Sequence, residues 1–317
     1  MSKRRVVVTG LGIVSPVGST VASAWDTVLR GQSGIGLITR FDTTQFATRI
    51  GGAVRDFDIG TYMSPKEARR MDEFIHYGVA AGVQAVQDSG LDFAAEDTSR
   101  CGVISGAGIG GLATIESEFE AFQATQSPRK ISPFFIPASI INMIAGHLSI
   151  RYGLRGPNLG VVTACTTSTH SIGLGYRTIQ YGDADVMLAG GGEMSTTRLG
   201  ISGFSQAKAL STRNDSPTEA SRPWDRDRDG FVAADGGGAI MLEELALDYR
   251  VHSYDLRKGD NFDPQFLAIN PVARLPTIVD HDAGDGAPLA VYGSAAILIY
   301  LAEKTGRLLP VTGRARA

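Results

Sequence analysis

The stretch VVTACTTSTHSIGLGYRTIQYG, residues 161–182, joins a β-branched run, a cysteine and a small-residue segment with helical character. The pattern predicts a strand that stops at Cys165, then a sharp turn and a helix. A thiol at a helix N-terminus meets unpaired backbone N–H groups and the positive end of the helix dipole, and both favour the thiolate. Cys165 is therefore a candidate nucleophile; the alternative is a small buried apolar residue, as many free cysteines are.

The same alternation of apolar runs and glycine-rich turns continues outward from this stretch. Because the apolar runs do not alternate with polar residues, they predict strands covered on both faces, and intervening helices predict a mostly parallel sheet. We expect a layered α/β domain over residues 1–245, with strands at 5–9, 101–105 and 186–189 and helices at 22–30, 67–89 and 112 to about 122.

Composition narrows the functional class. The chain has 317 residues, 43% hydrophobic and 20% charged, as in ordinary globular proteins. A formal net charge of −3 with scattered basic residues argues against nucleic acid and an anionic membrane surface as partners, because both need clustered Lys and Arg. Cys101 and Cys165 are too few for a disulfide framework or a cysteine zinc site, so we expect a cytoplasmic protein with no metal and no cofactor.

Two apolar segments have some features of membrane or export signals. Residues 3–24 imitate a signal peptide, but Gly10, Gly12 and Pro16 interrupt the apolar run, which suits a buried strand and a glycine turn better. Residues 287–302 come closest to a membrane span, yet they are shorter than the roughly 18 apolar residues required. We predict a core helix there.

Two further motifs imitate ligand sites. Gly106, Gly108 and Gly111 satisfy the G-x-G-x-x-G dinucleotide pattern between a strand and a helix, but the second strand with its acidic end does not follow. The run DRDRDG at residues 225–230 opens like a calcium loop, but its twelfth position is Gly236 where a bidentate Glu is required. Neither motif predicts a bound cofactor or metal.

Six ordered segments resemble the β-ketoacyl-[acyl-carrier-protein] synthases of bacterial fatty-acid synthesis, type II enzymes of the thiolase superfamily. These segments are RRVVVTGLGIVSPVG from Arg4, KISPFFIP from Lys130, GLRGPN from Gly153, TACTTSTHSIG from Thr163, ALSTRND from Ala209 and RPWDRDRDGFV from Arg222. Their order over about 240 residues makes the match specific, whereas a lone TAC would carry nothing.

This resemblance implies a thiolase-like fold and an acyl-accepting nucleophile at Cys165. It also implies that Ile109 lines the acyl pocket, that Phe134 lies near the channel, and that acyl carrier protein delivers both acyl and malonyl groups to a homodimer. His170 matches a position without a catalytic role and is predicted to be structural. The family's two catalytic histidines lie beyond the matched stretch, and His252 and His281 match neither of them.

A second resemblance begins near Leu242. Residues 242–310 resemble the thioredoxin-like N-terminal domain of bacterial glutathione transferases, through INPVARLPTIVD and VYGSAAILIYLAEKTG. Pro276 matches the cis-proline beside the glutathione site, and Ser294 matches the residue that binds the γ-glutamyl group. The family has an acidic residue before that serine, and this chain has Gly293. We therefore expect a partial β-α-β-β-α segment at residues 246–310, followed by a tail at 311–317.

The two resemblances together predict a chimera of two fragments, joined where LEEL at residues 242–245 fits both families. Three functional hypotheses stay open: a condensing enzyme retaining its acylation step, a glutathione-binding or transferase module, and a non-catalytic or misassembled chain. A synthase half without its partner half exposes an apolar face, so we expect poor solubility or oligomers. A monodisperse monomer with a cooperative melt would contradict this expectation.

Overall fold

The computed structural model describes residues 4–244, 252, 254–284 and 287–305, and it divides into two compact units. Unit 1 spans Lys3–Ala246 and unit 2 spans Leu247–Ala317. This division lies one residue beyond the predicted boundary after Leu245, and the predicted tail at 311–317 lies outside the described residues. The units are described separately below.

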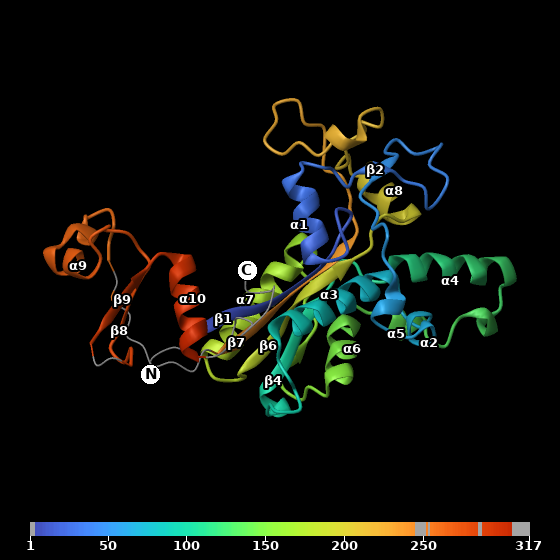
Figure 1. Cartoon of the computed structure of the whole chain (residues 1–317). Helices are drawn as coiled ribbons and strands as arrows, with labels where there is room; N and C mark the ends of the chain where they lie inside the picture. Colours follow the sequence, from blue (N-terminus) through green and yellow to red (C-terminus); the bar gives the residue numbers. More distant parts are fainter. Residues whose placement is uncertain (1–3, 245–251, 253, 285–286, 306–317) are drawn as a thin grey trace. The chain divides into compact units, whose positions relative to one another are not determined.

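Unit 1 is built on a five-stranded mixed sheet (Figure 1). The strands follow the order β1 (Val6–Val14), β7 (Gly236–Glu244), β6 (Val186–Glu193), β4 (Cys101–Gly106) and β5 (Asn158–Leu159). β4 is parallel to β5 and β6, as predicted, but β7 is antiparallel to both of its neighbours. The prediction of a mostly parallel sheet is wrong for β7, because that strand starts beside the end of β6, where Gly236 pairs with Glu193.

Helix α3 (Glu73–Ser89) lies directly against this sheet, and glycines make the close approach feasible. A Cβ on Gly10 would lie 2.0 Å from the carbonyl oxygen of Ala85, and one on Gly12 would lie 1.9 Å from that of Ala81. Only glycine fits at such distances. β1 therefore runs through the segment where we expected a glycine turn, and that expectation is wrong.

Helices cover both faces of the sheet, which gives the predicted α-β-α layering. Along β6, Leu188 belongs to the apolar cluster that includes α3 and α6 (Met143–Tyr152), whereas Met187 and Ala189 belong to the cluster that includes Ile179 of α7. Alternate residues of a strand point to opposite faces, so α7 (Thr167–Gln180) lies on the face opposite α3.

The remaining helices of unit 1 mostly follow the predicted boundaries. The predicted helix at 67–89 is two helices, because the carboxylate of Asp72 caps the N-terminus of α3, and Gly90 ends α3 in the left-handed conformation, as expected. The other helices are α1 (Val21–Leu29), α2 (Pro65–Ala68), α4 (Leu112–Thr125), α5 (Phe135–Ser139) and α8 (Arg198–Gln206).

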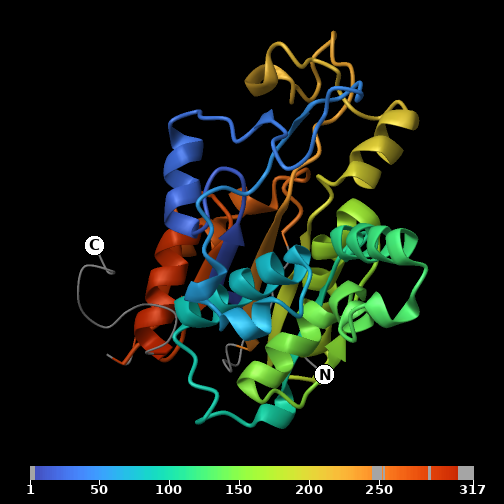
Figure 2. The same ribbon diagram turned by 90° about the vertical axis from the view of Figure 1, so that its right-hand side faces the viewer.

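Two loop regions meet at one end of unit 1, drawn in blue and gold at the top of Figure 2. The first carries the short strands β2 (Gly36–Leu37) and β3 (Ile50–Gly51), which pair with each other. The second is the long connection between α8 and β7. The hydroxyl of Thr48 donates to the carbonyl oxygen of Ser211 at 3.0 Å, so the two regions are in direct contact.

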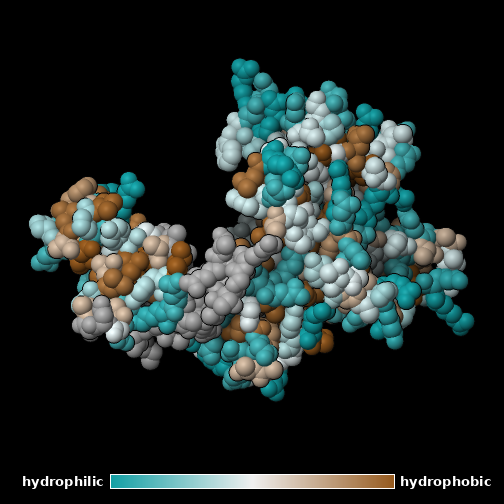
Figure 3. Space-filling model, in the orientation of Figure 1, coloured by the Kyte–Doolittle hydropathy of each residue, from teal (hydrophilic) through white to brown (hydrophobic). Residues whose placement is uncertain are grey.

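Several large apolar residues of unit 1 are exposed, and brown residues are scattered over the surface in Figure 3. Val8 and Leu11 pair with Leu242 and Ile240, which pack with the α7 cluster, so they lie on the same face of the sheet as α7. Val8 and Leu11 are 53% and 44% exposed, and Leu174 on α7 is 43% exposed. Apolar exposure of this kind marks a surface prone to association.

Unit 2 is smaller and has a two-stranded antiparallel sheet. Its elements are α9 (Pro264–Ile269), β8 (Thr277–Asp280), β9 (Leu289–Tyr292) and α10 (Ser294–Thr305). The described residues thus supply the last four elements of the predicted β-α-β-β-α segment. The single core helix predicted at 287–302 is wrong, because Gly293 takes a φ of +91° and separates a strand from a helix.

Candidate active site at the Cys165 turn

Cys165 lies in a short 3-10 turn, Ala164–Thr166, that leads directly into α7. The turn is sharp because Ala164 adopts a φ of +52°, a left-handed conformation unusual for a residue with a Cβ. The thiol is exposed, whereas the other cysteine, Cys101, is buried. The buried alternative for Cys165 is therefore wrong.

The strand that precedes this turn is shorter than predicted. β5 ends at Leu159, and residues 160–163 have no regular secondary structure. The carbonyl oxygen of Val161 lies against Gly106 of β4, where a Cβ would come within 2.0 Å of it. The β-branched residues before Cys165 thus pack over the end of β4 without extending the sheet.

Side-chain hydroxyls hold the backbone of the turn. The Oγ1 of Thr167 accepts a hydrogen bond from the N–H of Thr163 at 3.0 Å and donates to the carbonyl oxygen of Ala164 at 2.8 Å. The Nδ1 of His170 lies 2.8 Å from the Oγ1 of Thr163, which is the local contact expected of a structural histidine. These bonds fix the chain on both sides of Cys165.

A second turn, the glycine-rich segment of residues 106–111, lies against the Cys165 turn. A Cβ on Gly108 would be 3.1 Å from the Cα of Ala164, so the two backbones touch. The glycine at position 108 thus allows the glycine-rich turn to pack closely against the Cys165 turn. Ile109, the predicted acyl-pocket residue, stands on this segment beside the thiol turn, with 43% of its side chain exposed.

Phe134, the predicted channel residue, immediately precedes α5. The guanidinium carbon of Arg70 lies 4.5 Å from the centre of its ring, a cation–π contact. At the other end of α5, the carbonyl oxygen of Ser139 accepts a hydrogen bond from the N–H of Gly111 at 3.0 Å. The structure thus links the element after Phe134 to the glycine turn that carries Ile109.

Sequence reasoning missed Glu193, the last residue of β6. Its Oε2 accepts a hydrogen bond from the N–H of Ile109 at 2.8 Å and its Oε1 accepts one from Gly110 at 3.1 Å. Burial raises the pKa of this carboxyl, while the backbone N–H groups around it oppose that shift. The signal that could have revealed it is an acidic residue directly after a buried run ending in three glycines.

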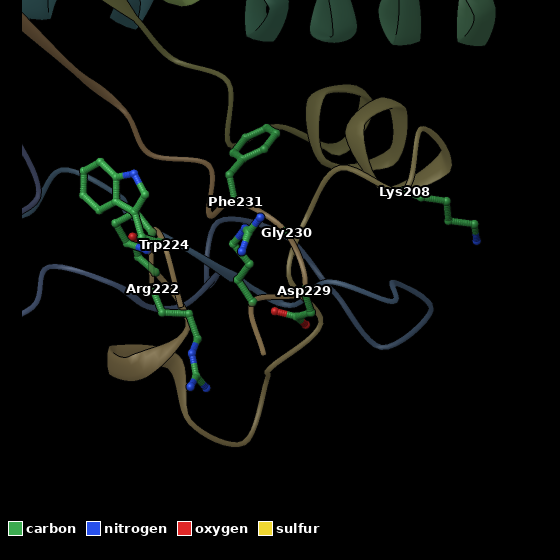
Figure 4. A pocket seen from close by; sticks show the side chains of 9 residues that line it. Lys208, Arg222, Trp224, Asp229, Gly230 and Phe231 are labelled. Carbon is green, nitrogen blue, oxygen red and sulfur yellow. The ribbon is translucent and has the colours of Figure 1, made fainter. Parts of the chain in front are cut away.

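The end of the acidic run, Arg228, Asp229 and Gly230, lines an open hollow of about 820 Å³ (Figure 4). Carboxylates of the run are engaged within the chain: Asp225 pairs with Arg222 at 2.7 Å, and Asp229 accepts from the N–H of Thr212 at 2.9 Å. Within the described ranges, no cluster of His, Cys, Asp and Glu could hold a metal ion. Nor does any helix among those residues have the length and apolar character to cross a membrane.

The two predicted glutathione contacts are neighbours in unit 2. The Leu275–Pro276 bond is cis, and the carbonyl oxygen of Pro276 accepts a hydrogen bond from the N–H of Gly293 at 3.1 Å. Ser294 follows as the first residue of α10, but its side chain is outside the described part of the chain. The two unmatched histidines, at positions 252 and 281, are exposed residues of this unit.

Two family models match the chain. The model for the beta-ketoacyl synthase N-terminal domain matches residues 3–247, and the model for the glutathione S-transferase N-terminal domain matches residues 238–304. The overlap covers most of β7, which in the structure pairs with β1 and β6 inside unit 1. The segment shared by the two resemblances is thus built into the synthase-like sheet.

Relatives and solved structures agree with the first match. The 3-oxoacyl-[acyl-carrier-protein] synthase 2 of Vibrio cholerae is 60% identical over 244 residues, which are 77% of this chain and 59% of that protein. The chain therefore spans less than two thirds of that relative's length.

Two solved structures resemble unit 1 at 28% identity. A beta-ketoacyl synthase from Burkholderia phymatum has a TM-score of 0.68 over 76% of this chain and 59% of its own. A ketosynthase solved in complex with its type II PKS acyl-carrier protein has a TM-score of 0.67 over 76% of this chain and 58% of its own. Through the N-terminal domain at residues 3–247, this chain belongs to the β-ketoacyl synthase family.

Proposed function

We propose that unit 1 is the acyl-accepting part of a β-ketoacyl-[acyl-carrier-protein] synthase and that Cys165 is its nucleophile. The observation that carries the proposal is an exposed thiol on a sharp turn at the start of α7, packed against the glycine turn that bears Ile109. The thiol is accessible at the turn, and a neighbouring apolar side chain suits an acyl chain.

In this reaction the Cys165 thiolate attacks the carbonyl carbon of an acyl thioester carried by acyl carrier protein. A new thioester forms on Cys165, the bond from the acyl carbon to the carrier's sulfur breaks, and the carrier leaves as its thiolate. Ile109 and Phe134 are the residues we assign to the acyl pocket and its channel. The carrier protein and a second copy of the chain are the partners that this function implies.

Condensation needs further groups. Malonyl carrier protein must lose carbon dioxide, and preorganised donors must hold the resulting enolate oxygen before it attacks the acyl thioester. His252 and His281 lie outside the matched residues 3–247 and receive no role in this step. We therefore infer that the chain alone performs the acyl transfer and stops at the acyl-enzyme.

Intact mass spectrometry after exposure to acyl carrier protein thioester tests this proposal. We expect one acyl adduct on the parent chain and none on Cys165→Ala. Cys101→Ala is the matched control, because that thiol is buried and burial raises its pKa to about 11, which keeps it protonated. An adduct that persists in Cys165→Ala, or no adduct on the parent, would overturn the assignment.

A second candidate function belongs to unit 2. We propose that it binds glutathione, because the two residues assigned from the resemblance, Pro276 and Ser294, lie close together. The N–H of Gly293, which directly precedes Ser294, donates a hydrogen bond to the carbonyl oxygen of Pro276. Calorimetric titration of the full chain with glutathione tests this, with Ser294→Ala expected to weaken binding. If the titration of the parent shows no heat of binding, the glutathione proposal is wrong, and unit 2 resembles a transferase domain without binding that ligand.

A further inference from the structure

We propose that Glu193 is a positioning residue that holds the glycine turn of residues 106–111 against the Cys165 turn, and that it thereby sets which acyl chains Cys165 accepts. The inference rests on the acylation proposed above. It concerns a residue that is not among the site residues predicted from the sequence.

The carboxylate of Glu193 is the common acceptor for this turn. Both of its oxygens are used, by the N–H groups of Ile109 and Gly110, and the N–H groups of Gly108 and Met194 also point to it. Hydrogen bonds to an ionised carboxylate are shorter and stronger than neutral ones. Several successive N–H groups facing one point form a concavity that requires an anion, and here the chain supplies its own.

The last residue of the turn, Gly111, is held by its hydrogen bond to Ser139, whereas Glu193 holds the middle of the turn at Ile109 and Gly110. Four of the turn's six residues are glycines, which lack side chains to pack and lose the most conformational freedom on folding. Gly110 adopts a φ of +91°, which few other residues would tolerate. Ile109 is 43% exposed, and its backbone N–H is bound to Glu193, so Glu193 restrains the point from which the Ile109 side chain starts.

The same carboxylate also sets the distance to the nucleophile. Gly108 lies between Glu193 and the Cys165 turn: a Cβ there would be 2.9 Å from the Oε2 of Glu193 and 3.1 Å from the Cα of Ala164. If Glu193 released the turn, Gly108 would be free to move from Ala164 and Ile109 would move with it. The carboxylate therefore couples the place of the acyl-pocket residue to that of the thiol.

Burial supports this assignment. The carboxyl is half-buried at the end of a buried strand, and that burial raises its pKa. Such a position is unfavourable unless hydrogen bonds compensate. The compensating groups are mostly the N–H groups of the turn beside the thiol, so the anion and the turn stabilise each other.

The experiment compares Glu193→Gln with the parent over a series of acyl carrier protein thioesters from butyryl to palmitoyl, following the Cys165 adduct by intact mass. Glutamine keeps the shape and removes the charge. We expect the ratio of short-chain to long-chain acylation rates to change about tenfold, the size expected for the loss of one charge-assisted hydrogen bond. Alkylation of Cys165 by iodoacetamide needs no acyl pocket and should stay at the parent rate.

Two further variants sharpen the test. Glu193→Asp keeps the charge on a shorter side chain and should restore part of the parent's chain-length profile, even where Glu193→Gln folds poorly. Glu219→Gln is the matched control, because Glu219 is an exposed carboxylate paired with Arg213. It should leave the profile unchanged. An equal slowing at every chain length would mean a general loss of structure and would overturn the proposal.

Hydrogen exchange separates this inference from the acylation on which it rests. If the parent takes no acyl group, the proposed function fails and the chain-length role of Glu193 fails with it. The amides of Ile109 and Gly110 then test the holding role alone: they should exchange faster in Glu193→Gln than in the parent. Unchanged exchange at these two amides would overturn that role as well.

Discussion

The two units of the chain use opposite means to join their elements. In unit 1, α3 crosses the sheet at positions without side chains, so that backbone rests on backbone at Gly10 and Gly12. In unit 2, the described part of the short sheet is tied to α10 by side chains, with Tyr300 and Lys304 both donating to Asp280. We therefore expect unit 1 to be sensitive to any side-chain atom added at these glycines, and the stability of unit 2 to depend on the pH through the ionisation of Asp280.

The core follows the same contrast. Unit 1 has clusters of fully buried aliphatic and aromatic residues on both faces of its sheet. In unit 2, among the side chains that the structure describes, the buried apolar residues are Phe266, Ile297 and Leu301. A small apolar core contributes little stability, so unit 2 depends more on its polar contacts.

The largest effect that we expect follows from Gly12→Ala. The new Cβ would lie 1.9 Å from the carbonyl oxygen of Ala81 and 2.8 Å from its carbonyl carbon, and neither backbone atom is free to yield. We expect the free energy of unfolding of unit 1 to fall by about 3 kcal/mol or more. Hydrogen exchange of the α3 amides under increasing denaturant measures unit 1 alone, because α3 lies within it.

Gly173→Ala is the matched control for that substitution. Gly173 lies in α7, and a Cβ there has no atom within 4 Å. Alanine is favoured over glycine inside a helix by up to about 1 kcal/mol, so the same chemical change should stabilise unit 1. If the two variants shift stability in the same direction, the backbone contact between β1 and α3 is not what distinguishes Gly12.

Local sequence patterns predicted most elements of unit 1, because apolar runs bounded by glycine are decided by neighbours in the chain. They did not predict the path of β1. Gly10 and Gly12 favour a turn on local grounds, and only the packing of α3 explains why the strand continues through them. The antiparallel direction of β7 likewise depends on its pairing with the end of β6, a tertiary contact that the local sequence of β7 does not reveal.

The candidate site was also predicted only in part, since the sequence indicated Cys165 but not Glu193. Cys165 was found because a β-branched run, a thiol and a helix follow one another in the chain. Glu193 was missed because its partners, Ile109 and Gly110, are more than eighty positions away. A carboxylate that binds distant backbone N–H groups leaves no periodic signal, and only the fold brings the two segments together.

The smallest effect concerns the acid stability of unit 2. Lys304 donates to Asp280 at 2.6 Å, and Tyr300 and the N–H of Asp282 also donate to it; together they lower the pKa of this carboxyl to about 2. A carboxyl whose folded pKa is lowered stabilises the fold above its unfolded pKa of 3.8, and loses that contribution as the pH falls through about 2.

Hydrogen exchange of β8 and α10, measured on the full chain across this pH window, should therefore show less difference between the parent and Asp280→Asn as the pH falls. Asp282→Asn is the control, because Asp282 gives only backbone atoms to this cluster: its N–H to Asp280 and its carbonyl oxygen to Lys304. A difference between parent and Asp280→Asn that stays constant from pH 5 to about 2 would contradict the lowered pKa. Such a result would also mean that apolar packing, and not the hydrogen bonds of Asp280, holds β8 to α10. The two units would then join their elements in more similar ways.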